Sequence, residues 1–474
     1  MLRQASSYMV AHGVSAVLGF SAIIIFTRLL SPEQYGIYVV GMSVAGIVNA
    51  VLFDWVRLSV LRYQSEGEGA DIRLTAFASY GVSAALSPLV VVILMLVTGG
   101  SWPDLALAAL VALALGLFDF GQEILKARLE PGAYMRAAIT RAVLTLGTSL
   151  VLVQAGLGGV GLLLGLTTAY LATGLIFSPR IWRGPIRGFD LADFRNIAAF
   201  GVPMALSGAI FAVHAALDRL IVVHLLGEGA AGVYGASADL VRQIILFPAV
   251  AVGSAMVPVI IRSLAEGGAQ RADKQFVTSA EMLMAAVLPA VVGLAIVAAP
   301  FSMLILGPEF RDTAAVLIPV LAFAWLFQAI THQYVQVSFH LAKTPKLFLM
   351  QGIVLLLVNV AATLMLVPRF GIVGAAWALV IAELAGVAVG IMLARRAHPL
   401  PLPLGRLLRV MAATAMMAAP TLLVARMDWL DPFLTLAAAV VTGMVTYALA
   451  AVVFDILGLR RLVLAQLRPA SAST

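Results

Sequence analysis

The chain has no cysteine and little charge. Only 11% of its 474 residues are Asp, Glu, Lys or Arg, about half the share found in soluble domains. The absence of cysteine excludes disulfides and every metal or redox site that depends on thiolates. The six histidines show no metal-ligand spacing such as HExxH, and no Gly-rich nucleotide-binding loop is present. We therefore expect no metal, no cofactor and no direct use of ATP.

Apolar residues dominate instead, at 62% of the chain, and the mean hydropathy is +1.04. Runs of about twenty apolar residues recur with short polar breaks, and each is long enough to cross a hydrocarbon core of about 30 Å. They predict an all-α polytopic membrane protein with about fourteen transmembrane helices. The predicted spans are 9–29, 35–53, 74–97, 103–122, 133–155, 158–177, 196–218, 230–255, 276–298, 313–335, 346–367, 371–394, 407–425 and 430–454.

The basic residues indicate the orientation of these spans. If the N-terminus is cytoplasmic, 23 of the 30 Lys and Arg residues fall on the inner side and only five at the outer ends. The remaining two, Arg141 and Arg242, lie inside spans. Adding or dropping one span would reverse every later loop and destroy this asymmetry. The pattern therefore favours fourteen spans with both termini in the cytoplasm, and it accounts for the net charge of +7 without a nucleic-acid partner.

Two pairs of segments indicate an internal repeat. LLSPEQYGIY from Leu29 and LLGEGAAGVY from Leu225 both consist of two leucines, five residues, a glycine, a β-branched residue and a tyrosine. LGGVGLLLGLTTAYLA from Leu157 similarly matches FGIVGAAWALVIAELA from Phe370. An even number of spans separates the copies, so the two halves have the same orientation.

This repeat predicts two lobes of six helices followed by two extra helices. The N-terminal lobe is expected at 1–188 and the C-terminal lobe at 189–398. Residues 399–474 would form the two extra helices and a cytoplasmic tail. Two repeated bundles with a substrate path between them are a common transporter design.

Five segments resemble a known family: TRLLSPEQYGIY from Thr27, FGVPMALSG from Phe200, LDRLIVVHLLGEGAAGVYGASADL from Leu217, LILGPEFRDTAAVLIPVLA from Leu304 and LVPRFGIVGAAWA from Leu366. They are similar to the polysaccharide transporters of the multidrug/oligosaccharidyl-lipid/polysaccharide exporter superfamily, which includes Wzx-type O-antigen flippases. The combination of the DRL turn, the GVY helix start and the GPEF loop is the most specific part of the resemblance.

The resemblance implies a V-shaped bundle of two lobes in a bacterial inner membrane. Such a protein moves a lipid-linked oligosaccharide, typically on undecaprenyl pyrophosphate, from the cytoplasmic to the periplasmic leaflet by alternating access. Its products feed O-antigen or exopolysaccharide synthesis. Its expected partners are this lipid-linked glycan, membrane lipids and the polysaccharide polymerase or export machinery.

Four arginines are candidates for binding an anionic headgroup. A charge at membrane depth is costly and usually faces protein or a water-filled cavity, and a guanidinium binds oxyanions in a bidentate manner. Arg242, with Asp239 one turn before it, is the deepest, although an ion pair between these two is an equal alternative. Arg141 is a second candidate if its side chain does not snorkel. Arg57 and Arg62 follow the second span at the cytoplasmic mouth, where ordinary positive-inside anchoring also explains them.

Energy coupling requires a titratable acid within a span. Glu383 is the most central candidate, with a hydrogen bond to a neighbouring helix as its structural alternative. Asp239 and Asp119 are the other candidates, whereas Glu281 is expected to be solvated near the inner interface. At the outer ends, a gating or a structural role is expected for Arg28, Asp218 and Arg219.

A membrane enzyme is the alternative from another functional class. A glycan polymerase or ligase tends to carry a large periplasmic loop or an acidic catalytic cluster, whereas the outer connections here are short. We therefore expect a transporter and not an enzyme. Within transporters, a lipid II flippase or a multidrug exporter of the same superfamily is the alternative.

Overall fold

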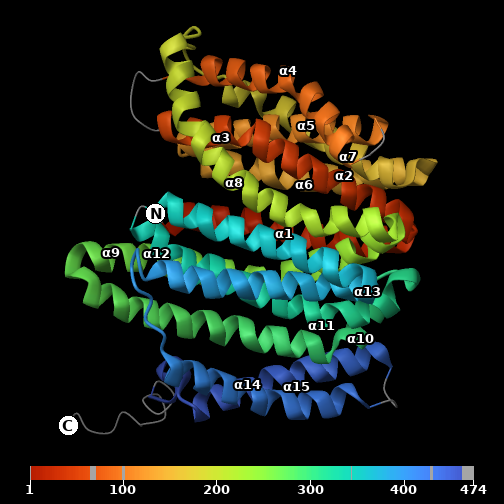
Figure 1. Cartoon of the computed structure of the whole chain (residues 1–474), viewed down its shortest axis with the longest axis vertical. Helices are drawn as coiled ribbons and strands as arrows, with labels where there is room; N and C mark the ends of the chain where they lie inside the picture. The colour runs from red at the N-terminus through yellow and green to blue at the C-terminus, as the bar shows by residue number, and fades with distance from the viewer. Residues whose placement is uncertain (1, 65–70, 99–101, 343, 428–430, 462–474) are drawn as a thin grey trace, which may run out of the picture. The chain divides into compact units, whose positions relative to one another are not determined.

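The computed structural model describes residues 2–64, 71–98, 102–342, 344–427 and 431–461. All regular secondary structure in these ranges is helical, which confirms the predicted fold class. In lipid, every backbone N–H and C=O must find its partner inside the protein, and a helix satisfies both within one segment. The chain packs as two compact units, residues 1–236 and 237–474 (Figure 1). The predicted tail beyond residue 461 lies outside the described residues.

The first unit is built around α2, α5 and α7, which pack against one another. The helix α8 lies along α2 and α3, and α1 packs against α6. Apolar side chains such as Val48, Val111 and Leu163 fill the space between the central helices and are buried. The helices are α1 (Leu2–Leu29), α2 (Pro32–Leu52), α3 (Asp54–Tyr63), α4 (Arg73–Thr98), α5 (Trp102–Ala127), α6 (Pro131–Leu152), the π-helix η1 (Val153–Leu157), α7 (Gly158–Ile181), α8 (Leu191–Leu226) and the first turns of α9 (Glu228–Ile296).

In the second unit, α11 packs against α13, and α14 and α15 form a hairpin. This hairpin lies on α9 through a small core in which Val410 and Ala413 meet Met284 and Leu288. After α9 the elements are α10 (Ala298–Ile305), α11 (Pro308–Ile330), the π-helix η2 (Thr331–Val335), α12 (Gln336–Leu341), α13 (Pro345–Ala394), α14 (Leu404–Ala425), α15 (Pro432–Val453) and the 3₁₀ turn η3 (Ile456–Gly458).

Three helical stretches are much longer than one membrane crossing and contain a break at a glycine. Gly156, Gly268 and Gly371 have φ values of 90°, 67° and 57°, which are accessible to glycine at little cost. The breaks at Gly156 and Gly268 fall between two predicted spans, and the break at Gly371 falls on the first residue of the predicted span 371–394. In the described ranges, ten helical stretches are long and apolar enough to cross a membrane. These three stretches are among them, so the count of fourteen spans stays a prediction.

The predicted repeat is visible in the backbone. Gly158 and Gly371 occupy matching positions in LGGVG and FGIVG, and their φ/ψ values are 53°/−134° and 57°/−141°. This region of φ/ψ space is essentially reserved for glycine. The next matched pair, Gly161 and Gly374, both lie against the backbone at the end of the preceding helix. The same local structure at matched positions supports the repeat.

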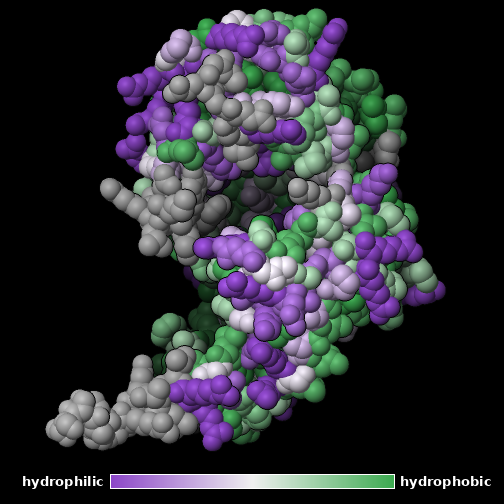
Figure 2. Space-filling model, turned by 90° about the vertical axis from the view of Figure 1, so that its left-hand side faces the viewer, coloured by the Kyte–Doolittle hydropathy of each residue, from purple (hydrophilic) through white to green (hydrophobic). Residues whose placement is uncertain are grey.

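Two predicted connections contain more helix than expected. Residues 54–63 form α3, which buries Val56 and Val60 and exposes Arg62, as expected of a helix that covers a core with one face. The predicted connection between the spans 230–255 and 276–298 is helical on both sides of Gly268. At the ends of the helices shown on the left of Figure 1, hydrophilic side chains gather on the surface (Figure 2).

Candidate functional site

The two predicted arginines of the cytoplasmic mouth both lie on α3. Arg57 Nε is 3.0 Å from Asp54 Oδ1 in a half-exposed ion pair. The Arg62 guanidinium lies 4.3 Å from the centre of the Phe200 ring on α8 and 5.4 Å from that of Tyr63. α8 approaches α3 closely at this point, because a Cβ on Gly201 would overlap the Trp55 carbonyl oxygen. Ser59 Oγ also donates a hydrogen bond of 2.8 Å to Ile197 O.

The coupling candidate Asp119 on α5 lies near this mouth. Its half-buried carboxylate is within electrostatic range of Asp54, Arg57, Glu123 and Lys126. Lys126 Nζ lies 2.7 Å from Glu123 Oε1. The structure therefore brings together one predicted binding residue, Arg57, and one predicted coupling residue, Asp119. No sequence pattern indicated that the acid Glu123, which is 5% exposed, belongs to the same charged group.

Arg141 on α6 lies against two aromatic rings. Its guanidinium carbon is 5.7 Å from the ring centre of Phe118 on α5 and 5.6 Å from that of Tyr170 on α7. The two rings are themselves 5.4 Å apart. Cation–π contacts of this kind offset part of the cost of holding a charge away from water. The Arg141 side chain is thus placed by three different helices.

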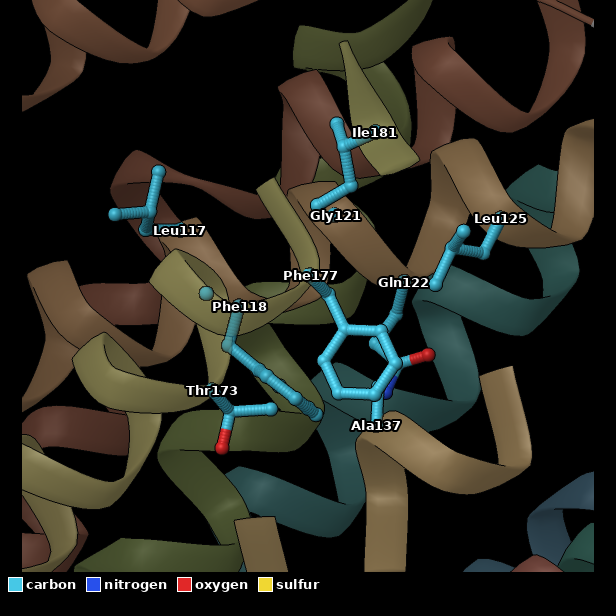
Figure 3. A pocket seen from close by; sticks show the side chains of 10 residues that line it. Leu117, Phe118, Gly121, Gln122, Leu125, Ala137, Thr173, Phe177 and Ile181 are labelled. Carbon is cyan, nitrogen blue, oxygen red and sulfur yellow. The ribbon is translucent and has the colours of Figure 1, made fainter. Parts of the chain in front are cut away.

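A small cavity lies between α5, α6 and α7. Phe118, Gln122 and Phe177 line it together with aliphatic and small side chains (Figure 3). Gln122 Oε1 is buried and accepts no hydrogen bond within the described part of the chain. The cavity holds only about 20 Å³ of space for water-sized molecules, far below the range of about 300–1,000 Å³ that is typical of ligand sites. This cavity is therefore too small to hold an oligosaccharide.

The gating candidates at the predicted outer ends differ in their surroundings. Asp218 is 4% exposed. It accepts hydrogen bonds of 2.6 Å from Tyr234 Oη and 2.9 Å from the Arg219 N–H. Arg28, at the end of α1, is exposed. The DRL segment lies within α8 and not in a turn. The bond between Asp218 and Tyr234 joins it to the GVY segment near the start of α9.

In the second unit, the candidates Arg242 and Asp239 lie on α9. Arg242 is exposed and Asp239 half-buried. The Arg242 guanidinium carbon is 5.7 Å from the ring centre of Trp325 on α11. An aromatic ring contacts the plane of a guanidinium, whereas an anion binds along its N–H edges. Arg242, like Arg141, thus lies against an aromatic ring, but Arg242 is exposed whereas Arg141 is half-buried between two rings.

Glu383 on α13 is 1% exposed, and its Oε1 accepts a hydrogen bond of 3.0 Å from Gln328 Nε2 on α11. The structural alternative from the sequence, a bond to a neighbouring helix, is therefore present. One turn after Gln328, α11 becomes the π-helix η2, a feature often found at functional sites. The polar series continues there, with His332 Nδ1 2.8 Å from Gln336 Oε1.

Arg73 was not among the candidates from the sequence, yet it is 2% exposed and makes five side-chain hydrogen bonds. It donates to Asp71 Oδ1 and Oδ2 at 2.6 and 2.8 Å. It also donates to the carbonyl oxygens of Ile181, Arg183 and Pro185 at 2.7–3.0 Å. Arg73 therefore fixes the connection from α7 to α8. Its long-range partners have no signature in the sequence.

The same cluster perturbs Asp71, which lies outside the predicted spans. Burial by itself would raise the pKa of Asp71. Hydrogen bonds from the Arg73 side chain and from the backbone N–H groups of Arg73 and Arg187, together with the Arg73 charge, act in the opposite direction and are stronger in sum. The pKa of Asp71 is therefore below its usual value, and the carboxylate is ionised at neutral pH.

The expectation that Glu281 is simply solvated is wrong. Glu281 is 2% exposed, and its Oε2 accepts a hydrogen bond of 2.8 Å from Arg406 Nη1 on α14. Its Oε1 accepts another of 2.8 Å from the Leu457 N–H. The hairpin of α14 and α15 covers this part of α9 and removes Glu281 from water. The residue thus anchors the two extra helices.

Comparison with known proteins gives a consistent result. A family model described as "Polysaccharide biosynthesis protein" matches residues 25–315. The probable low-salt glycan biosynthesis flippase Agl15 of Haloferax volcanii is 24% identical over 392 residues, which cover 79% of each chain.

Solved transporters have the same fold. The lipid II flippase MurJ in its inward closed conformation superposes with a TM-score of 0.78, at 14% identity, over 96% of this chain and 99% of that one. An inward-facing multidrug resistance MATE family transporter of the MOP superfamily gives a TM-score of 0.66, at 14% identity, over 85% and 99%. At these identities the solved structures establish the fold alone.

Proposed function

Because the chain belongs to the polysaccharide biosynthesis protein family, we propose that it is a flippase for a lipid-linked oligosaccharide. It carries this glycan from the cytoplasmic to the periplasmic leaflet of a bacterial inner membrane by alternating access. Undecaprenyl pyrophosphate is the proposed lipid carrier, and O-antigen or exopolysaccharide the proposed product. The flippase named among its relatives and the shared transporter fold support this proposal.

One observation carries the proposal furthest. Arg57 and Arg62 lie on one short helix at the predicted cytoplasmic end, and the rings of Tyr63 and Phe200 lie beside Arg62. Guanidinium groups bind diphosphate oxygens strongly, and aromatic faces provide a flat apolar surface for a sugar ring. α3 and the part of α8 that carries Phe200 thus offer both chemistries that a glycosylated diphosphate requires.

Deeper in the protein, Arg141 and Arg242 are the proposed sites for the headgroup at membrane depth. Each stands against an aromatic face. The ring contacts the plane of the guanidinium, whereas an oxyanion binds through its N–H edges. Asp119, Asp239 and Glu383 are the proposed coupling acids. Arg28, Asp218 and Arg219 are proposed to act at the outer ends.

The decisive experiment locates the lipid-linked glycan in cells that lack this protein, using a label on the sugar that reports the leaflet. Repeat units trapped on the cytoplasmic side would support a flippase. Units that reach the periplasm but stay unpolymerised or unattached would overturn the proposal and favour a polymerase or ligase.

The cationic residues are tested separately. Arg242→Ala, at normal expression, is expected to abolish export of the glycan. Arg426→Ala is the matched control, because Arg426 is an exposed arginine at the end of α14 with no place in the proposed path. Normal export by Arg242→Ala would remove Arg242 from the mechanism.

A further inference from the structure

The first turns of α2 and α9 touch through their backbones. A Cβ on Gly36 would overlap the carbonyl oxygen of Glu228, and a Cβ on Gly232 would overlap that of Pro32. All four residues belong to the first unit. Any side chain larger than hydrogen would force the two helices apart, so the glycines permit a helix contact that is otherwise sterically impossible.

This contact is symmetric with respect to the repeat. In the aligned segments from Leu29 and Leu225, Pro32 matches Glu228 and Gly36 matches Gly232. Each glycine therefore contacts the other helix at the carbonyl oxygen of the residue that lies four positions before the other glycine: Gly36 contacts Glu228, and Gly232 contacts Pro32. Equivalent surfaces that contact each other in this way form an isologous interface. The repeated motif is thus self-complementary, which accounts for its glycine in both copies.

The same register continues one turn further. Gly235 matches Val39, and a Cβ on Gly235 would lie 3.1 Å from Val39 Cβ. Val39 is 1% exposed, so the two helices are in contact over about two turns. We call this contact, made by Pro32, Gly36 and Val39 with Glu228, Gly232 and Gly235, the glycine seam. The charge asymmetry places the seam at the periplasmic ends of both helices.

We propose that the glycine seam is the outer gate of the transporter. It joins the start of one repeat to the start of the other and is closed in this structure. Separation of α2 from the first turns of α9 opens the path by which the glycan leaves. The closest approaches across the seam are between backbone atoms, and Cα–H···O contacts between helices are individually weak. This inference rests on the proposed flippase function and adds the place at which release is controlled.

A cross-link across the seam tests the gate, and a chain without cysteine provides a clean background. In Val39→Cys/Gly235→Cys, the Cβ separation of 3.1 Å is a few tenths of an ångström shorter than the range of about 3.5–4.5 Å found in disulfides, so a small shift of the two helices allows the bond to form. Oxidation is expected to lower glycan export at least tenfold, and a reductant is expected to restore it. Thr421→Cys/Gly443→Cys is the matched control, because a Cβ on Gly443 lies 3.2 Å from Thr421 Oγ1 within the α14–α15 hairpin. Its oxidation should leave export unchanged.

Full export by a chain shown to be fully cross-linked at 39 and 235 would overturn the gate and make the seam a fixed pivot. If the reduced double variant does not export the glycan, the single variant Val39→Cys is used to test whether the seam opens during export. A membrane-impermeant maleimide added outside should label its thiol about tenfold faster during export than after glycan synthesis is blocked. Ala439→Cys, at a fully buried position in α15, is the control.

Equal labelling of the Val39→Cys variant in both conditions would also overturn the gate. The two hypotheses fail in different ways. If the wild-type chain does not move the glycan, the flippase hypothesis is overturned. If the wild-type chain and the cross-linked variant both export the glycan, only the gate hypothesis is overturned.

Discussion

Arg73→Lys tests how strongly one buried guanidinium holds the connection from α7 to α8. Arg73 makes five hydrogen bonds, two to Asp71 and three to carbonyl oxygens of residues 181–185. A lysine keeps the charge but has only three donors on one atom and cannot reproduce the planar fork. We expect two or three of the five bonds to be lost. At about 1 kcal/mol each, the connection then opens more easily by about 2–3 kcal/mol.

Limited proteolysis measures this opening directly. The connection contains Arg183 and Arg187, which are exposed and are trypsin sites. When opening is fast, the cleavage rate follows the open population, so about 2–3 kcal/mol corresponds to about 30- to 150-fold faster cleavage. The assay uses inside-out vesicles and follows the fragments that end at these two residues. Cleavage after Arg396, in the connection from α13 to α14, is the internal control.

An unchanged rate at Arg183 and Arg187 in Arg73→Lys would refute this reasoning. It would show that the hydrogen bonds of Arg73 do not hold the connection closed. A parallel increase at Arg396 would instead indicate general destabilisation of the fold.

Three further results are expected. The pKa of Asp71 is lower in the folded state than in the unfolded state, where it is about 3.9. Ionised Asp71 therefore stabilises the fold above this unfolded pKa, and the stabilisation is lost as the pH falls through the folded pKa. The melting temperature should fall more steeply below about pH 4 in the wild type than in Asp71→Asn. Tyr234→Phe removes the donor to buried Asp218 and should lower stability by about 1–3 kcal/mol in a thermal melt; an unchanged melt would show that this bond is dispensable. A double-mutant cycle of Arg62→Gln and Phe200→Leu should give a coupling of about 0.5–1 kcal/mol in the same assay, and a coupling of zero would contradict the contact.

The motif residues show how far sequence patterns extend into the tertiary structure. The DRL and GVY segments are recognisable as a combination in the sequence, and the structure joins them through Asp218 and Tyr234. The glycine of each repeated segment is also visible as a pattern. The sequence does not show that each glycine contacts the helix of the other, because the same repeat could also occur in two segments that lie far apart in the structure.

Features that depend on local chemistry can be read from the amino-acid sequence. Apolar run length indicates where a helix can cross a membrane, and the Lys and Arg distribution predicts the orientation. Gly158 and Gly371 permit the same φ > 0 break in both repeats. Which charges are buried, and what they bond, depends on the packing of the helices in three dimensions. Arg73 meets carbonyls more than a hundred residues away, and Glu281 loses water only because α14 and α15 cover it. Such contacts have no signature in the sequence, because packing is set by the shapes of many side chains at once and not by any short segment.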